Sequence, residues 1–196
     1  MNFLAHLFLS GKKEHLVAGN FLADFLKNKE VAALPLPIQE GVRLHRKIDS
    51  FTDSHPMVLQ SVRRLRPVHR KFSPVVLDIC YDYILVKNWG RYSAESIYHF
   101  TASMYGILED YAHLMPAFLQ KRLPLMIKDD WLVKYGTEKG LRFTFDRMKK
   151  RTRYPEFFEN AVDSFFKDHD LYEKEFNLFF PDLIAAAEKW REKGEK

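Results

Sequence analysis

Apolar residues recur three and four positions apart along most of the chain, and this spacing predicts buried and amphipathic α-helices rather than strands. Valine and isoleucine nowhere alternate with polar residues for long, and glycine is scarce, with 8 residues. No βαβ alternation, internal repeat or low-complexity linker interrupts the pattern. We therefore predict an all-α fold, a helical bundle that forms one single domain over residues 1–196.

Prolines and small polar residues predict where the helices begin and end. Leu34–Pro37 should end the first long helix, and His55-Pro56 should stop or bend the second, because the residue before a proline disfavours the helical conformation. Ser73-Pro74 is a predicted cap with a first-turn proline, and Ser93–Ser96 opens a further helix. The helices predicted by range are 15–28, about 38–55, about 57–70, 75–89, 137–152, 156–167 and about 171–193, the last ending in a solvated Glu/Lys tail.

The composition indicates a folded protein with a basic surface. The chain is 46% hydrophobic, 15% aromatic and 29% charged, which is typical of a globular domain. The apolar N-terminal segment has no basic region ahead of it and is too short for a membrane span. The single cysteine, Cys80, excludes an internal disulfide and fits a reducing compartment, so we expect a cytoplasmic protein. The formal charge of +5 favours an anionic partner.

Ionisable side chains lie inside otherwise apolar helical segments, where an unpaired charge is costly to bury. Residues four apart share a helix face, so His45 and Asp49 point together, as do Asp78 and Asp82. Two neighbouring carboxylates repel unless a positive charge lies near, and a divalent metal ion supplies one. A histidine with several carboxylates suits manganese, magnesium or iron. The candidate residues are His6, Asp24, His45, Asp49, Asp53, Asp78 and Asp82.

Most of these residues also have an ordinary structural explanation. His6 fits a packed, hydrogen-bonded core histidine, and Asp24 fits a buried carboxylate tied to an arginine. His45 and Asp49 fit an ion pair on a solvated helix face. Asp53 fits the end of a helix. Taken together, however, the group favours a common cation.

The pair Asp78 and Asp82 is the hardest to explain as surface, because aliphatic and tyrosine side chains surround it in the sequence. Cys80, between the two aspartates, should be a buried thiol rather than an activated nucleophile. The adjacent pair His169-Asp170 is of the kind seen in a large class of metal-dependent phosphohydrolases. Its polar setting instead indicates a junction between two helices, with Asp170 as an N-cap.

Four segments together resemble the acyl carrier protein phosphodiesterase family, also called holo-acyl-carrier-protein hydrolases. They are NFLAHL at the N-terminus, GNFLADF at 19–25, GVRLHRKIDSFTD at 41–53 and LDICYDYILVKNW at 77–89. A looser helical likeness continues through most of the chain, including Asp130-Trp131-Leu132. The order and spacing of the four segments make the resemblance specific, although each alone would be weak.

The resemblance implies an all-helical fold distantly similar to the HD phosphohydrolases. It implies a metal-dependent, manganese-favouring hydrolysis of the phosphodiester between 4'-phosphopantetheine and a serine of holo-acyl carrier protein. The sequence departs from the superfamily pattern, because the spaced His45 and Asp49 replace an adjacent histidine-aspartate pair. We predict His45, Asp49, Asp78 and Asp82 as metal ligands. His6 is a further predicted ligand, while Asp24 and Asp53 are predicted to serve in catalysis, Asp24 alternatively completing the ligand set.

Acyl carrier proteins as a class are small and acidic, so a basic surface would attract one. The predicted partner-binding residues are Arg43, Arg46, Lys47, Arg63, Arg64, Arg66 and Arg70, joined by Lys71, with Lys149, Lys150, Arg151 and Arg153 as another patch. Any single one also fits a solvated helix face. Two other functions stay open: a similar metal site acting on a nucleotide or small phosphate ester, and a basic module that binds nucleic acid. The buried carboxylates and the lack of a recognisable nucleic-acid motif argue against the last.

Overall fold

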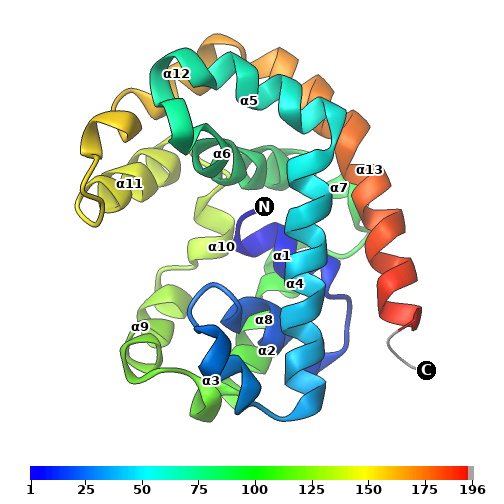
Figure 1. The fold of residues 1–196 in the computed structure, drawn as a ribbon. Helices are drawn as coiled ribbons and strands as arrows, with labels where there is room; N and C mark the ends of the chain where they lie inside the picture. The colour runs from blue at the N-terminus through cyan, green and yellow to red at the C-terminus, as the bar shows by residue number, and fades with distance from the viewer. Residues whose placement is uncertain (194–196) are drawn as a thin grey trace.

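The computed structural model describes residues 1–193 and shows an all-helical protein (Figure 1). These residues contain no β-strand, which confirms the predicted all-α class. Among them, no helix is both long enough and apolar enough to cross a membrane. The elements are α1 (Phe3–Leu9), α2 (Glu14–Leu22), α3 (Asn28–Ala32), α4 (Leu36–Ser54), α5 (Pro56–His69), η1 (Arg70–Phe72), α6 (Ser73–Lys87), α7 (Trp89–Tyr92), α8 (Ile97–Asp110), η2 (Ala112–Leu114), α9 (Ala117–Lys128), α10 (Trp131–Lys134), α11 (Glu138–Lys149), η3 (Pro155–Phe158), α12 (Ala161–Lys167) and α13 (His169–Lys193).

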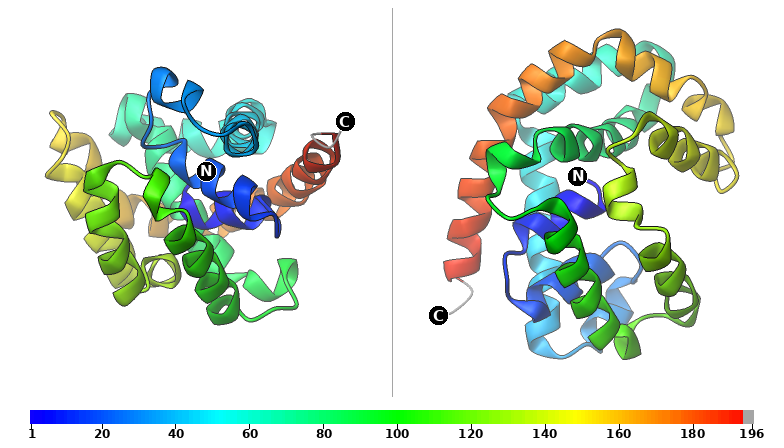
Figure 2. Two further views of the ribbon diagram at one scale, coloured as in Figure 1. Left: turned by 90° about the horizontal axis from the view of Figure 1, so that it is seen from below. Right: turned by 180° about the vertical axis from the view of Figure 1, so that it is seen from behind.

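Helix α1 lies near the centre of the molecule, surrounded by longer helices from the rest of the chain (Figures 1 and 2). Its Leu4 and Leu7 are completely buried, and Leu9 is 1% exposed. The hydrophobic cluster to which they belong extends into α2, α4, α6, α8 and α13. Because His6 belongs to α1, this packing carries its imidazole into the interior, where it is 2% exposed.

Helices α2 and α4 cross almost backbone to backbone, because each has a glycine at the crossing. A β-carbon added to Gly19 would lie 2.0 Å from the carbonyl oxygen of Ile38. One added to Gly41 would lie 2.6 Å from the carbonyl oxygen of Leu16. Any side chain at either position would therefore force the helices apart. The close approach brings polar side chains next to the crossing within hydrogen-bonding distance of each other.

The first long helix is shorter than predicted. We expected a continuous helix over 15–28, but α2 ends at Leu22 and α3 follows only after a turn. In this turn the ring of Phe25 stacks on that of Phe3, with centroids 5.7 Å apart. The apolar side chain is thus partly buried by tertiary contact instead of by continuing the helix. As a result, Asp24 lies on the turn and not on a helix face.

Other predicted boundaries need smaller corrections. Helix α4 has Pro37 in its first turn and starts slightly ahead of the predicted position near Ile38. Ser73 is the first residue of α6 rather than its cap, and its hydroxyl donates to the carbonyl of Arg70 at 2.7 Å. The helix predicted over 156–167 is divided into η3 and α12, because Asn160 has a left-handed conformation with φ of 55°. The Glu/Lys tail beyond residue 193 lies outside the described residues.

Helix α13 runs along the outside of the molecule (Figure 1) and is fixed near both of its ends. Near its start, Glu175 accepts hydrogen bonds from the guanidinium of Arg64 in α5 at 2.8 and 2.6 Å. Near its end, Arg191 donates to the carbonyl of Leu9 at the end of α1, at 2.5 Å. The side chain of Arg64, a predicted partner-binding residue, is therefore used inside the molecule.

Candidate metal centre

Helix α1 and the middle of α4 bring two histidines and one aspartate together. The carboxylate of Asp49 bridges the edges of two imidazoles, with Oδ1 3.1 Å from His6 Nε2 and Oδ2 3.0 Å from His45 Nε2. The two rings stack with their centroids 4.0 Å apart. One potential ligand atom from each residue lies within 4.8 Å of the others. The three side chains are therefore close enough for a single ion to contact them all.

Two of these side chains hold the protonation states that a metal ion requires. Burial lowers the pKa of His6 to about 4, and the neighbouring His45 acts in the same direction, so the His6 imidazole is neutral at pH 7. Burial opposes ionisation of Asp49, but hydrogen bonds from His45 and His6 outweigh it and lower the pKa of Asp49 below its ordinary value. Metal ions bind neutral imidazole and ionised carboxylate, which these two residues supply.

The orientation of His45 is set by Asn20, a completely buried residue of α2 that the sequence interpretation did not single out. The Asn20 amide nitrogen donates to the carbonyl of His6 at 3.0 Å and to the Ser10 hydroxyl at 2.8 Å. Its oxygen must therefore face His45 Nδ1, which lies 2.9 Å away and donates to it. His45 then directs Nε2 at Asp49, 3.0 Å from Oδ2. The sequence feature that could have indicated this role is the polar amide of Asn20 inside the otherwise mostly apolar segment GNFLADF.

Asp24 and Asp53 lie at the exposed edge of this group. Asp24 Oδ1 is 3.5 Å from His45 Nε2, and the Asp24 side chain is 42% exposed. Burial of part of the carboxyl raises the pKa of Asp24, although His45 opposes the shift. Asp53 lies one turn beyond Asp49 in the last turn of α4 and is exposed. Asp24 is thus adjacent to the candidate centre, whereas Asp53 is a turn away.

The second acidic pair, Asp78 and Asp82, lies apart from the group of three. Asp82 is completely buried and accepts hydrogen bonds from the backbone N–H groups of Leu4 at 2.9 Å and Ala5 at 3.1 Å, at the start of α1. Burial raises the pKa of Asp82 to about 7, although these two bonds oppose the shift. Asp78 pairs with the α-ammonium group of Met1 at 3.1 Å. The N-terminal ammonium group and the first turn of α1 thus supply partners to this pair, and its role as a metal ligand stays a prediction.

The α-ammonium group of Met1 joins the two acidic groups, a connection that residue spacing did not reveal. Besides its contact with Asp78, it lies 3.5 Å from Asp49 Oδ1. Burial acts to lower its pKa, but the carboxylates of Asp78 and Asp49 outweigh burial and raise the pKa to about 10. A positive charge is therefore held beside the ligand group at neutral pH.

The chemistry of the donor set fits a divalent metal ion. His6 and His45 offer imidazole nitrogens and Asp49 offers a carboxylate, and Asp24 lies beside them. Two histidines and one carboxylate form a mixed nitrogen and oxygen set, which suits iron and manganese and contains no thiolate. The donor set thus agrees with the class of ion that the sequence predicted, and the full set of ligands stays a prediction.

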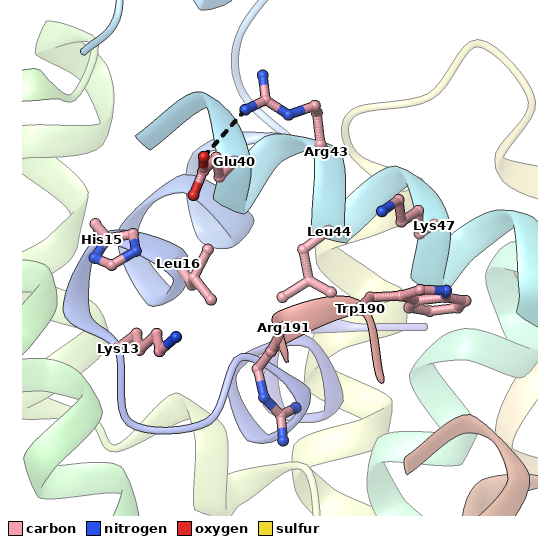
Figure 3. A pocket seen from close by; sticks show the side chains of 9 residues that line it. All are labelled: Lys13, His15, Leu16, Glu40, Arg43, Leu44, Lys47, Trp190 and Arg191. Atoms are coloured by element: carbon pink, nitrogen blue, oxygen red, sulfur yellow. Dashed lines mark ion pairs between the residues drawn. The ribbon is translucent and has the colours of Figure 1, made fainter. Parts of the chain in front are cut away.

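The predicted basic residues of α4 lie away from this centre. Arg43 and Lys47 line a cavity of about 440 Å³ between α4, the start of α2 and the end of α13 (Figure 3). Leu44 and Trp190 form part of its apolar wall, and Arg43 pairs with Glu40 at 3.6 Å. Lys47 follows His45 by two residues, which places it about 200° around the helix and on the other side of α4.

The other predicted partner-binding residues are also distant or engaged. Arg46 donates to the side-chain oxygen of Asn28 at 2.8 Å. Arg63 and Arg66 are exposed on α5, which lies on the far side of α6 from α1 (Figure 1). Arg70 lies over the ring of Phe157, with its guanidinium carbon 5.8 Å from the ring centroid. Their role in partner binding stays a prediction.

The structure also shows the surroundings of two features to which we assigned no function, the His169-Asp170 pair and Cys80. His169 Nδ1 lies 3.4 Å from Asp170 Oδ1, and with Glu173 they form a second group of potential metal ligands. Asp170 is fully exposed and belongs to the first turn of α13, so it is not the N-cap that we predicted. Cys80 is buried, and burial raises the pKa of its thiol well above the ordinary value. Such a thiol is not an activated nucleophile.

Fold and site together define an all-helical protein with a candidate divalent-metal centre of two histidines and one aspartate. A family model for acyl carrier protein phosphodiesterase matches residues 1–183. Because this match covers most of the chain, the protein belongs to the acyl carrier protein phosphodiesterase family, as the resemblance of the four segments indicated.

Relatives cover nearly the whole chain. An acyl carrier protein phosphodiesterase of Photorhabdus laumondii is 29% identical over 197 residues, covering 96% of each chain. Those of Enterobacter sp. strain 638 and Escherichia coli are 27% and 28% identical, covering 95% and 96% of this chain and 97% and 98% of their own. No solved structure matches the chain. The likeness to HD phosphohydrolases therefore stays a prediction.

Proposed function

We propose that this chain hydrolyses the phosphodiester bond between 4'-phosphopantetheine and the serine of holo-acyl carrier protein, giving apo-acyl carrier protein and 4'-phosphopantetheine. The match over residues 1–183 and the names of the relatives support the substrate. The placement of Asp49 between His6 and His45 is the observation that carries a metal-assisted hydrolysis.

Manganese is the metal that we favour, with magnesium and iron as alternatives. His6 and His45 would hold it through their Nε2 atoms, and Asp49 through its carboxylate. When bound, a divalent ion lowers the pKa of water and polarises a phosphoryl oxygen. Asn20 keeps the His45 imidazole turned toward this position through the 2.9 Å hydrogen bond to Nδ1.

Asp24 is the group to which we assign proton transfer. Its carboxyl is 42% exposed and lies 3.5 Å from His45 Nε2, and burial of its remaining part raises its pKa. As the oxygen of water bonds to phosphorus, the bond from phosphorus to the serine oxygen breaks. Protonated Asp24 then supplies a proton to the serine oxygen, and the proton released by water restores it. Asp53, a turn away, is the second candidate for this role.

The test is incubation of purified protein with holo-acyl carrier protein and Mn²⁺, with the carrier protein measured by mass spectrometry. The wild type should remove one 4'-phosphopantetheine per carrier protein. His45→Gln and Asp49→Asn should each lower the rate at least about a hundredfold, because each removes a ligand and its charge pairing. His113→Gln is the matched control, because His113 is exposed and bonds only to a backbone carbonyl. Full activity of both ligand variants would show that the assigned site is wrong.

A substrate panel separates this function from a phosphohydrolase that acts on small molecules. Nucleotides and small phosphate esters should be hydrolysed far more slowly than holo-acyl carrier protein. Only the reaction with the acidic protein partner should weaken strongly with rising salt, because its association is electrostatic. Faster hydrolysis of a nucleotide would contradict the proposed substrate.

A further inference from the structure

Three arginines gather on the side of the molecule formed by α9, α10 and α11. Arg122 belongs to α9, Arg147 to α11, and Arg151 follows one turn after Arg147. The guanidinium carbon of Arg147 lies 4.2 Å from the ring centroid of Trp131 in α10, and 5.6 Å from that of Phe143. We call Arg122, Arg147 and Arg151 the arginine surface.

Within residues 1–193 no carboxylate forms an ion pair with any member of the arginine surface. The acidic groups of this region already have other cationic partners: Asp129 pairs with Lys134 at 3.8 Å, and Asp146 with Lys149 at 2.7 Å. Nearer the start of α11, Arg142 forms ion pairs with Glu138 and Asp163. The local carboxylates are thus in ion-pair contact with other cations, and Asp129 acts on Arg147 only at longer range.

Arg147 and Arg151 are four residues apart at and just beyond the end of α11, a spacing at which like charges repel. Burial lowers the pKa of Arg122, and the charges of Arg151 and Arg147 lower it further. Burial and Arg151 likewise lower the pKa of Arg147. Like charges held near one another with no carboxylate in ion-pair contact favour an anionic ligand or partner.

The arginine surface lies beside the candidate metal centre. Tyr135, at the end of α10, is 6% exposed; burial raises the pKa of its hydroxyl, the charges of Asp82 and Asp24 also raise it, and that of Arg147 lowers it. The ring of Phe118 in α9 packs on that of Phe25, next to Asp24, with centroids 6.1 Å apart. In the front and rear views, α9, α10 and α11 lie along one side of the molecule (Figures 1 and 2).

We propose that Arg122, Arg147 and Arg151 form the surface on which the acidic carrier protein docks, with its modified serine directed toward the metal centre. This inference rests on the proposed function. An acidic surface of the partner would supply the carboxylates that the three guanidinium groups lack. The cavity lined by Arg43 and Lys47 lies on the other side of α4 from the centre, so a carrier protein bound there would face away from it.

The test measures binding of apo-acyl carrier protein, which presents the protein surface without the cleavable bond. We expect the double variant Arg122→Glu/Arg151→Glu to weaken binding at least about tenfold and to flatten its dependence on salt. The matched control is Lys121→Glu/Lys139→Glu. It makes the same change of net charge on α9 and α11 at exposed residues outside the arginine surface, and it should bind as the wild type does.

Thermal melting by circular dichroism verifies that both double variants fold, and Arg147→Lys tests the third arginine without removing its charge. Equal binding of apo-acyl carrier protein by the folded Arg122→Glu/Arg151→Glu variant and the wild type would overturn the docking surface and leave the proposed hydrolysis intact. Equal loss in the lysine control would overturn it too, because net charge alone would then explain the effect. Failure of the wild type to hydrolyse holo-acyl carrier protein would instead refute the proposed function.

Discussion

Replacing Asn20 by alanine should remove the hydrogen bond that orients His45 and so weaken metal binding. The change removes three buried hydrogen bonds: to the His6 carbonyl at 3.0 Å, to Ser10 at 2.8 Å and from His45 Nδ1 at 2.9 Å. The His6 carbonyl keeps its hydrogen bond from the Ser10 hydroxyl, so the Ser10 oxygen and His45 Nδ1 are the groups that lose a needed partner. At about 1–3 kcal/mol each, the free energy of unfolding should fall by about 2–6 kcal/mol. Loss of the partner that orients a metal-bound histidine typically lowers metal affinity about 10–100-fold.

The assay is titration of the metal-free protein with Mn²⁺ by calorimetry, together with urea unfolding. Ser10→Ala is the matched control, because it disturbs the same hydrogen-bond network without touching His45. We expect Ser10→Ala to lower the free energy of unfolding by about 1–2 kcal/mol and to leave Mn²⁺ affinity nearly unchanged. Asn20→Ala should lower both quantities.

Folded Asn20→Ala that binds Mn²⁺ within about threefold of the wild type would refute this reasoning, since the predicted loss is 10–100-fold. An equal loss of affinity in Ser10→Ala would refute it as well. In that case the orientation of His45 would not be the property that Asn20 controls.

Packing, charge pairing and protonation each give a further prediction. In urea unfolding, Gly41→Ala should lower the free energy of unfolding by at least about 1–3 kcal/mol, because its β-carbon would clash with backbone. Gly106→Ala is the control: its β-carbon meets open space in α8, so the change should be neutral or stabilising. Arg64→Ala leaves the 5%-exposed Glu175 side chain without its cation and should cost about 3–5 kcal/mol, and equal stability of the variant and the wild type would contradict this. The His6 pKa of about 4 in the fold lies below the ordinary 6.5, so the metal-free protein should lose stability, by up to about 3 kcal/mol, as pH falls from 6.5 to 4. Unfolding measured at both pH values should show this loss, and His6→Gln should reduce it.

The sequence predicted the helices well because helix formation depends on residues three and four apart, which are local in the chain. It also placed His45 and Asp49 together correctly, since one helical turn alone brings them to 3.0 Å. The predicted helix over 15–28 was too long, because Phe25 packs partly buried against Phe3, a residue distant in the sequence, after α2 has ended at Leu22. Helix periodicity contains no information about such a contact.

The resemblance of four segments was confirmed by the family match over residues 1–183. Which side chains surround the His45 and Asp49 pair, by contrast, was beyond sequence reasoning. Asp78 and Asp82 have the same spacing as His45 and Asp49, and their more apolar surroundings made them look like the stronger pair. In the structure, backbone N–H groups and the Met1 ammonium compensate them.

The sequence by itself determined the helical class, the positions of most helices, the His45 and Asp49 pair and the family, because these depend on local spacing and on short ordered motifs. Only the tertiary structure decided which residues join that pair. Packing of α1 in the core brings His6 to Asp49, and the glycine crossing of α2 and α4 brings Asn20 to His45. Both contacts link residues far apart in the chain, and the packing of whole helices, rather than any local pattern, sets their distances.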